Sequence, residues 1–185
     1  MLFGKSLLHV NQNEGKIYSV SDIKGYYNDM TEKVTKDLKT DTIPKVNTES
    51  GEEIYFPTAV FQYGLGAYDL YLLEGKKEYL DKFTACADWA LENLDEKGRW
   101  NNFFFIYPDT PYSAMSQGEG ISLLARAYKE FNDDKYFTAA KKALEFMLIP
   151  VEEGGTAKYD GDGIFLLEYP LPQQRVACEK AALPV

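Results

Sequence analysis

The sequence predicts a mainly α-helical protein, an incomplete α/α toroid of repeated inner and outer helical hairpins with one small β-hairpin. Two observations predict the helices. Segments that are apolar on every side alternate with amphipathic segments, as expected where outer helices cover inner ones. In addition, Gly64-x-Gly66 recurs 54 residues later as Gly118-x-Gly120, and such internal repeats are typical of helical-hairpin arrays. A plain helical bundle with coincidental similarity is the alternative.

The first predicted hairpin joins helices over residues 58–73 and 78–94. Pro57 stands just ahead of the first helix, where proline favours a helix start. Apolar residues surround this helix almost completely, so we expect it to be buried. The second helix has a single apolar face and should lie outside, with Cys86 as a small buried side chain.

The second predicted hairpin joins helices over residues 117–131 and 134–148. A loop with two prolines, Pro108 and Pro111, leads into it. Gln117 and Glu119 stand among small residues at this helix start, whose free N–H groups would suit a carboxylate or a sugar hydroxyl. An ordinary loop followed by a core helix is the alternative.

Two short apolar runs, residues 156–159 and 164–169, flank an Asp-Gly turn and predict a β-hairpin. The acidic turn lacks the other ligands of a calcium loop. Glu168 and Tyr169 close the second run, and a carboxylate beside a phenol can act as an acid/base pair or simply lie on the surface.

The remaining segments complete the predicted organisation. Residues 24–39 carry a partial helical stripe, and residues 40–53 are typical of a surface loop. We therefore expect an N-terminal extended segment with a short helix over residues 1–50, a helical-hairpin domain over 51–172 and a divergent tail over 173–185.

The composition excludes several classes of function. The net charge of -9 argues against a nucleic-acid partner, and it requires a local basic patch for any polyanionic ligand. One histidine, His9, and two cysteines, Cys86 and Cys178, are too few for a histidine-based metal site, a catalytic triad or a disulfide framework. We expect no metal and no cofactor. Without a signal-like or membrane-spanning run, the expected location is cytoplasmic, with no membrane partner.

Several short motifs, in this order, resemble the D-glucuronyl C5-epimerase family over about residues 24–172. They are Gly25-Tyr26-Tyr27-Asn28-Asp29-Met30, Pro57 with Gln62-Tyr63-Gly64-Leu65, Trp100, Ala114-Met115-Ser116-Gln117-Gly118-Glu119-Gly120 and Glu168-Tyr169-Pro170. The resemblance implies a C-terminal α/α toroid domain and an isomerase that converts glucuronate to iduronate units in heparan- or heparosan-type polysaccharide. It places Glu168 and Tyr169 in the active site as catalytic residues. Expected substrate-binding residues are Gln117, Glu119, Tyr63, Tyr112, Arg99 and Trp100.

The chain departs from the family pattern after Pro170, where members continue with an apolar helix and further hairpins that supply more catalytic tyrosines. The sequence here reads Leu171-Pro172-Gln173-Gln174 and ends soon after, as in a truncated member. Two alternatives therefore stay open: a glycan-binding remnant without catalysis, or a glycoside hydrolase that uses Glu119 and Glu168 as its two carboxylates. An open array also leaves apolar helix faces uncovered, which predicts self-association, for example as a homodimer.

Overall fold

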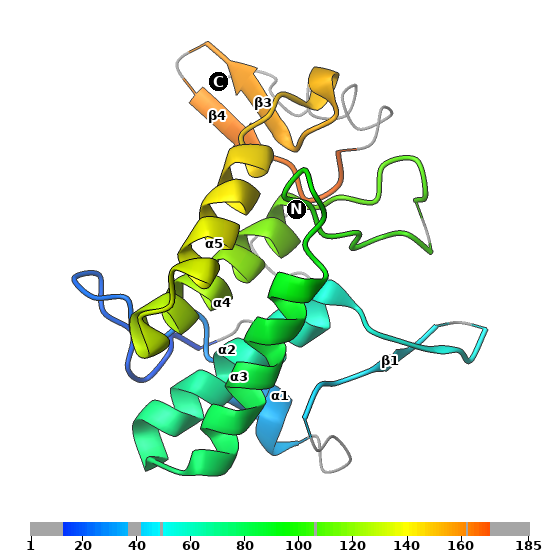
Figure 1. The fold of residues 1–185 in the computed structure, drawn as a ribbon. Helices are drawn as coiled ribbons and strands as arrows, with labels where there is room; N and C mark the ends of the chain where they lie inside the picture. The colour runs from blue at the N-terminus through cyan, green and yellow to red at the C-terminus, as the bar shows by residue number, and fades with distance from the viewer. Residues whose placement is uncertain (1–12, 37–41, 49, 106, 162, 171–185) are drawn as a thin grey trace, which may run out of the picture.

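The computed structural model describes residues 13–36, 42–48, 50–105, 107–161 and 163–170, so His9 and Cys178 lie outside the described residues. The described chain is mainly helical, with two small antiparallel β-hairpins (Figure 1). Helices α2 (Pro57–Glu74) and α3 (Lys77–Glu92) form a first pair, and α4 (Ala114–Phe131) and α5 (Asp134–Met147) form a second. The mainly helical class and the two helix pairs predicted from the sequence are confirmed.

Local signals fix the helix ends. Helix α2 has a proline in its first turn and ends at Gly75, whose φ of 69° suits glycine. Helix α4 begins three residues before the predicted start, because the Ser113 hydroxyl accepts a hydrogen bond from the Ser116 amide and caps it. It ends at Asn132, with a φ of 52°. The Asp133 carboxylate then accepts from the Lys135 amide at the start of α5.

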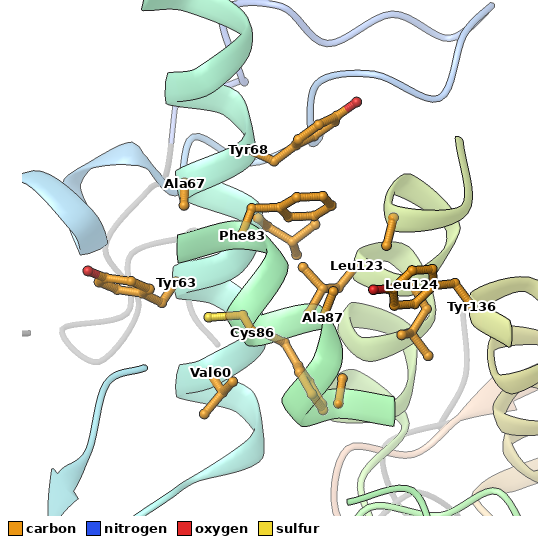
Figure 2. Packing of buried hydrophobic residues seen from close by; sticks show 14 of the residues in the cluster. Val60, Tyr63, Ala67, Tyr68, Phe83, Cys86, Ala87, Leu123, Leu124 and Tyr136 are labelled. Atoms are coloured by element: carbon orange, nitrogen blue, oxygen red, sulfur yellow. The ribbon is translucent and has the colours of Figure 1, made fainter. Parts of the chain in front are cut away.

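The core lies where α2 meets α3 and α4 (Figure 2). Helix α2 is buried on nearly every side, as its sequence predicts. The ring of Tyr68 on α2 stacks on Phe83 of α3 with centroids 4.4 Å apart, and Phe83 also stacks on Phe131 of α4 at 6.0 Å. Cys86 is fully buried, which confirms its predicted place in the core.

The partial helical stripe over residues 24–39 contains one short helix in the described chain, α1, which covers Thr31–Thr35. Long-range hydrogen bonds hold the preceding residues outside a helix. The guanidinium of Arg126 donates to the carbonyl oxygens of Lys24 and Gly25, and the Asp69 carboxylate accepts from the Tyr26 amide. Those backbone groups are therefore not available for helical hydrogen bonds.

Two hairpins flank the helices. Strands β1 (Val46–Asn47) and β2 (Glu53–Ile54) pair within the segment predicted as a loop, and a two-residue strand is too short to show an alternating pattern. Strands β3 (Ala157–Asp160) and β4 (Gly163–Leu166) pair with Asp160 opposite Gly163, which confirms the hairpin predicted there. A short 3-10 helix, η1 (Val151–Glu153), precedes β3.

An apolar groove of about 640 Å³ runs along α4 and α5 and is lined by Ile121, Tyr128, Phe137 and Leu144 among others. In the repeat, Ala140 and Leu144 of α5 correspond to Phe83 and Ala87 of α3, which are buried between the two hairpins. The face of α5 that lines the groove thus corresponds to the face of α3 that packs between the two hairpins. No described helix combines the length and apolarity needed to cross a membrane.

The repeated glycines have different surroundings. A Cβ atom at Gly64 would lie 2.7 Å from the Cβ of Cys86 and 2.8 Å from a methyl group of Leu123, so α2 approaches its neighbours there only because the side chain is absent. A Cβ atom at Gly118 would meet nothing within 4 Å. The two positions therefore form a matched pair.

We expect Gly64→Ala to lower the free energy of unfolding by about 1–3 kcal/mol through overpacking. Gly118→Ala should raise it by about 0.5–1 kcal/mol, because alanine is the better helix former where space is open. Urea denaturation followed by circular dichroism measures both. Equal effects at the two positions would contradict the packing described here.

Candidate functional site

The end of strand β4 is fastened to the start of helix α4 through main-chain atoms. The Leu167 amide donates to the Thr156 carbonyl at 2.8 Å, and the Ala114 amide donates to the Leu167 carbonyl at 3.0 Å. Glu168 and Tyr169 follow directly and are half-buried. The Tyr169 ring stacks on Phe103, with centroids 5.0 Å apart and planes 22° apart. The aromatic loop before α4 and the chain after β4 therefore meet at this pair.

The pKa of the Tyr169 phenol is raised above its ordinary value, first by burial and then by its hydrogen bond to Glu168 and the charge of that carboxylate. A phenolate beside a carboxylate would suffer like-charge repulsion. Tyr169 therefore keeps its proton at neutral pH and can donate it, while the neighbouring carboxylate can accept one.

Glu119 of α4 is a second carboxyl group at this end of the helix. Its Oε1 accepts a hydrogen bond from the Gln62 amide of α2 at 2.9 Å, while its buried Oε2 has no hydrogen-bond partner among the described residues. Burial raises the pKa of Glu119 to about 7, and the charge of Glu168 adds to this rise, whereas Gln62 and Lys33 oppose it. Glu119 therefore lies close enough to the Glu168–Tyr169 pair for the charge of Glu168 to act on it.

Gln117 is expected to bind substrate, and in the structure its side chain makes its hydrogen bonds within the protein. Its side-chain amide donates to the carbonyl oxygens of Gly98 (2.9 Å) and Ala143 (3.2 Å) and accepts from the Trp100 amide (3.0 Å). The side chain is fully buried, and its backbone amide bonds to the Ser113 carbonyl. Because α4 starts earlier than predicted, neither group is available to a ligand.

Trp100 and Tyr63 are also expected at the substrate, and both lie in the core, 1% and 2% exposed. The Trp100 indole donates to the Ala90 carbonyl at 2.8 Å, and its ring fills the space that Gly120 leaves free. The Tyr63 hydroxyl accepts from the Lys82 ammonium at 2.9 Å. Large rings buried in this way stabilise the fold.

Arg99 and Tyr112 are brought together and remain half-exposed. The Arg99 guanidinium lies 4.7 Å from the centre of the Tyr112 ring, and its Nε donates to Asp95 at 2.6 Å. The sequence reasoning missed Gln62, Lys33 and Phe103. Gln62 belongs to a motif that the sequence already singled out, whereas nothing distinguishes Phe103 from its aromatic neighbours or Lys33 from the other surface lysines.

Residues 95–177 match the family model described as the D-glucuronyl C5-epimerase C-terminus. The chain is also 35% identical over 107 residues to a D-glucuronyl C5-epimerase from Caenorhabditis elegans, an alignment that covers 54% of this chain and 17% of that protein. The chain thus spans a small part of the length of this curated relative. These matches confirm the family resemblance that the sequence motifs predicted.

The raised pKa of Glu119 predicts a pH-dependent contribution to stability. The pKa is about 7 in the folded state against an ordinary value of 4.5, so the native state binds the proton more tightly. Stability therefore falls as the pH rises from about 5 to 8. Glu119→Gln, which resembles the protonated form, should match the wild type near pH 5 and exceed it near pH 8 in urea denaturation.

Glu96→Gln, at an exposed position, serves as the control for that comparison. Its difference in stability from the wild type should be the same at both pH values. An equal difference between Glu119→Gln and the wild type at both pH values would contradict the raised pKa.

Proposed function

We propose that this chain, a member of the D-glucuronyl C5-epimerase family over residues 95–177, acts on the uronate units of a heparan- or heparosan-type polysaccharide by exchanging the proton at C5. The observation that carries the proposal is the Glu168–Tyr169 pair, fastened to the start of α4 and stacked on Phe103. The family match supports the same reaction. The alignment covers 17% of the Caenorhabditis elegans relative, so the activity of that whole protein is not assigned to this chain.

The chemistry assigns different tasks to the two side chains. The Glu168 carboxylate accepts the C5 proton, and the electron pair of the broken C–H bond delocalises into the neighbouring substrate carboxylate. The Tyr169 phenol, which keeps its proton at neutral pH, can return one to C5. One C–H bond breaks and one forms, with no net oxidation or reduction. Inversion requires return from the opposite face, whereas exchange with solvent requires only the first step and a return.

The surroundings of the pair support an anionic substrate. Because the pKa of Glu119 is raised to about 7, this carboxyl group is partly protonated at neutral pH and adds less negative charge than an ordinary glutamate would. Lys33 lies close enough to lower the pKa of that carboxyl group and contributes positive potential. We also propose that the two helix pairs are part of an α/α toroid, as their repeated inner and outer arrangement and the family resemblance suggest.

Incubation with heparosan in deuterium oxide, followed by NMR at the uronate C5 position, tests the proposal. Wild type should introduce deuterium, and Glu168→Gln or Tyr169→Phe should lower the rate about 100-fold or more, as is usual when a general acid or base is removed. Glu78 and Tyr79 offer a matched Glu-Tyr pair at the start of α3. Glu78→Gln and Tyr79→Phe should leave the rate unchanged. A folded wild type that gives no exchange would contradict the proposal.

A glycoside hydrolase is the second candidate, because burial, with a smaller contribution from the charge of Glu168, raises the pKa of Glu119 to about 7, as suits the general acid of a carboxyl pair. The same incubation distinguishes the two. Release of new reducing ends favours hydrolysis, and deuterium at C5 without chain cleavage favours the epimerase reaction.

We further propose that a second copy of the chain covers the apolar groove on α4 and α5. The groove repeats the face that α3 buries against α4, and a copy of the chain carries helical hairpins of the same kind. Light scattering at micromolar concentration should give a mass above that of the monomer. The double variant Phe137→Lys, Leu144→Lys should be monomeric with an unchanged circular dichroism spectrum, because both side chains are exposed. A monomeric wild type would contradict the self-association.

A further inference from the structure

A second pocket, of about 330 Å³, lies where the segment after β2, the end of α3 and the loop before α4 come together. It is lined by aromatic rings, amide side chains and one ion pair, among them Tyr55, Trp89, Phe104, Asn93, Asn101 and Arg99 with its partner Asp95. Its volume lies within the range of small-ligand sites. None of these residues serves the proton-transfer chemistry proposed above.

The aromatic residues form walls that the fold leaves open. Tyr55 and Phe104 are 43% and 44% exposed, although both are large and could have been buried. The rings of Tyr55 and Trp89 pack in a tilted arrangement, with centroids 6.1 Å apart and planes 47° apart. Flat rings held in this way present apolar faces to the C–H face of a sugar.

Arg99 supplies the positive charge. Its Nε donates to Asp95 at 2.6 Å, no further hydrogen bond joins the guanidinium to a described residue, and the side chain is 25% exposed. The Tyr112 ring, 4.7 Å away, supports the guanidinium on one face. An arginine oriented by two neighbours is suited to paired hydrogen bonds with a carboxylate.

Lys45 adds a second cation near the pocket, because its ammonium lies 5.1 Å from the centre of the Tyr55 ring. Arg99 and Asp95 line the pocket and Lys45 lies beside it, so these three groups carry one net positive charge in a chain of net charge -9. This local positive charge favours an anionic ligand over a neutral one.

The pocket and the proposed catalytic pair share one loop. Phe104 lines the pocket, and the preceding residue, Phe103, stacks on Tyr169. A saccharide of several units bound at the pair would thus extend along this loop toward the pocket.

We infer that this pocket is a separate subsite for a uronate unit of an acidic saccharide, in which Arg99 binds the carboxylate and the aromatic walls hold the ring. The choice of a uronate rests on the proposed function. Binding here requires no chemistry at Glu168 or Tyr169, so the two proposals can fail independently.

Intrinsic fluorescence measures binding at this pocket, because both tryptophans of the chain, Trp89 and Trp100, line it. The probe is a heparosan octasaccharide, and the control is the same octasaccharide with its carboxylates reduced to alcohols. Wild type should respond to the first and bind the second at least tenfold more weakly. Equal affinity for the two, or no response to either, would overturn the subsite.

Three variants test the residues. Arg99→Gln removes the charge, Asn101→Asp adds a repelling carboxylate at an exposed position, and Phe104→Ala removes an exposed wall. Each should weaken octasaccharide binding about tenfold or more. Phe137→Ala, at another exposed phenylalanine that lines the apolar groove, should not change it. If Arg99→Gln loses folded structure, the binding measured for Asn101→Asp and Phe104→Ala tests the subsite.

The deuterium-exchange assay separates this inference from the proposed function. Octasaccharide binding that depends on these residues, without any exchange at C5, would retain the subsite and overturn the catalytic proposal. Exchange with the same KM in wild type, Asn101→Asp and Phe104→Ala would retain the catalytic proposal and overturn the subsite. A raised KM with unchanged kcat in these variants would support both.

Discussion

The hydrogen bonds of the buried Gln117 side-chain amide hold together the part of the molecule that contains the candidate site. Its three hydrogen bonds join the loop at Gly98 and Trp100 to α4 and to the end of α5. Each bond contributes only about 1 kcal/mol net, but an unpaired buried partner costs about 1–3 kcal/mol. The amide therefore selects one position for the loop. Trp100 then fills the space beside Gly120, and Arg99 is held next to it at the surface.

The positions of the cations address a difficulty in the composition. An acidic chain repels an acidic polymer unless positive charge is concentrated where the polymer binds. Lys33 and Lys45 line a cavity of about 330 Å³ beside Gln62, and Arg99 lines another on the loop before α4. The aromatic rings between them, Phe56 and Phe103, pack with centroids 6.2 Å apart. Positive charge thus borders the aromatic surface that the proposed substrate would cross.

The sequence predicted the features that have a local pattern. Helices α2 to α5 were found because their apolar spacing repeats over four or five turns, and the β3–β4 hairpin because Asp-Gly marks its turn. The hydrogen bonds of Gln117 and Trp100 could not be predicted, because their partners lie 10 to 26 residues away and leave no periodic signal. The bounds of the short helix α1 could not be predicted for the same reason, since Arg126 is about 100 residues from the carbonyl groups that it binds. The pocket at Arg99 combines three separate segments, which no single stretch of sequence reveals.

The attachment of Leu167 has a consequence for how this site could change over time. Both of its hydrogen bonds use peptide groups, which every amino acid except proline supplies in full. The backbone at Glu168 and Tyr169 is thus positioned without help from either side chain. Mutation can therefore alter the reactive groups while the scaffold around them stays in place, so that reactivity and architecture can evolve along separate routes. A chain with this arrangement could lose or exchange its chemistry and still keep its shape.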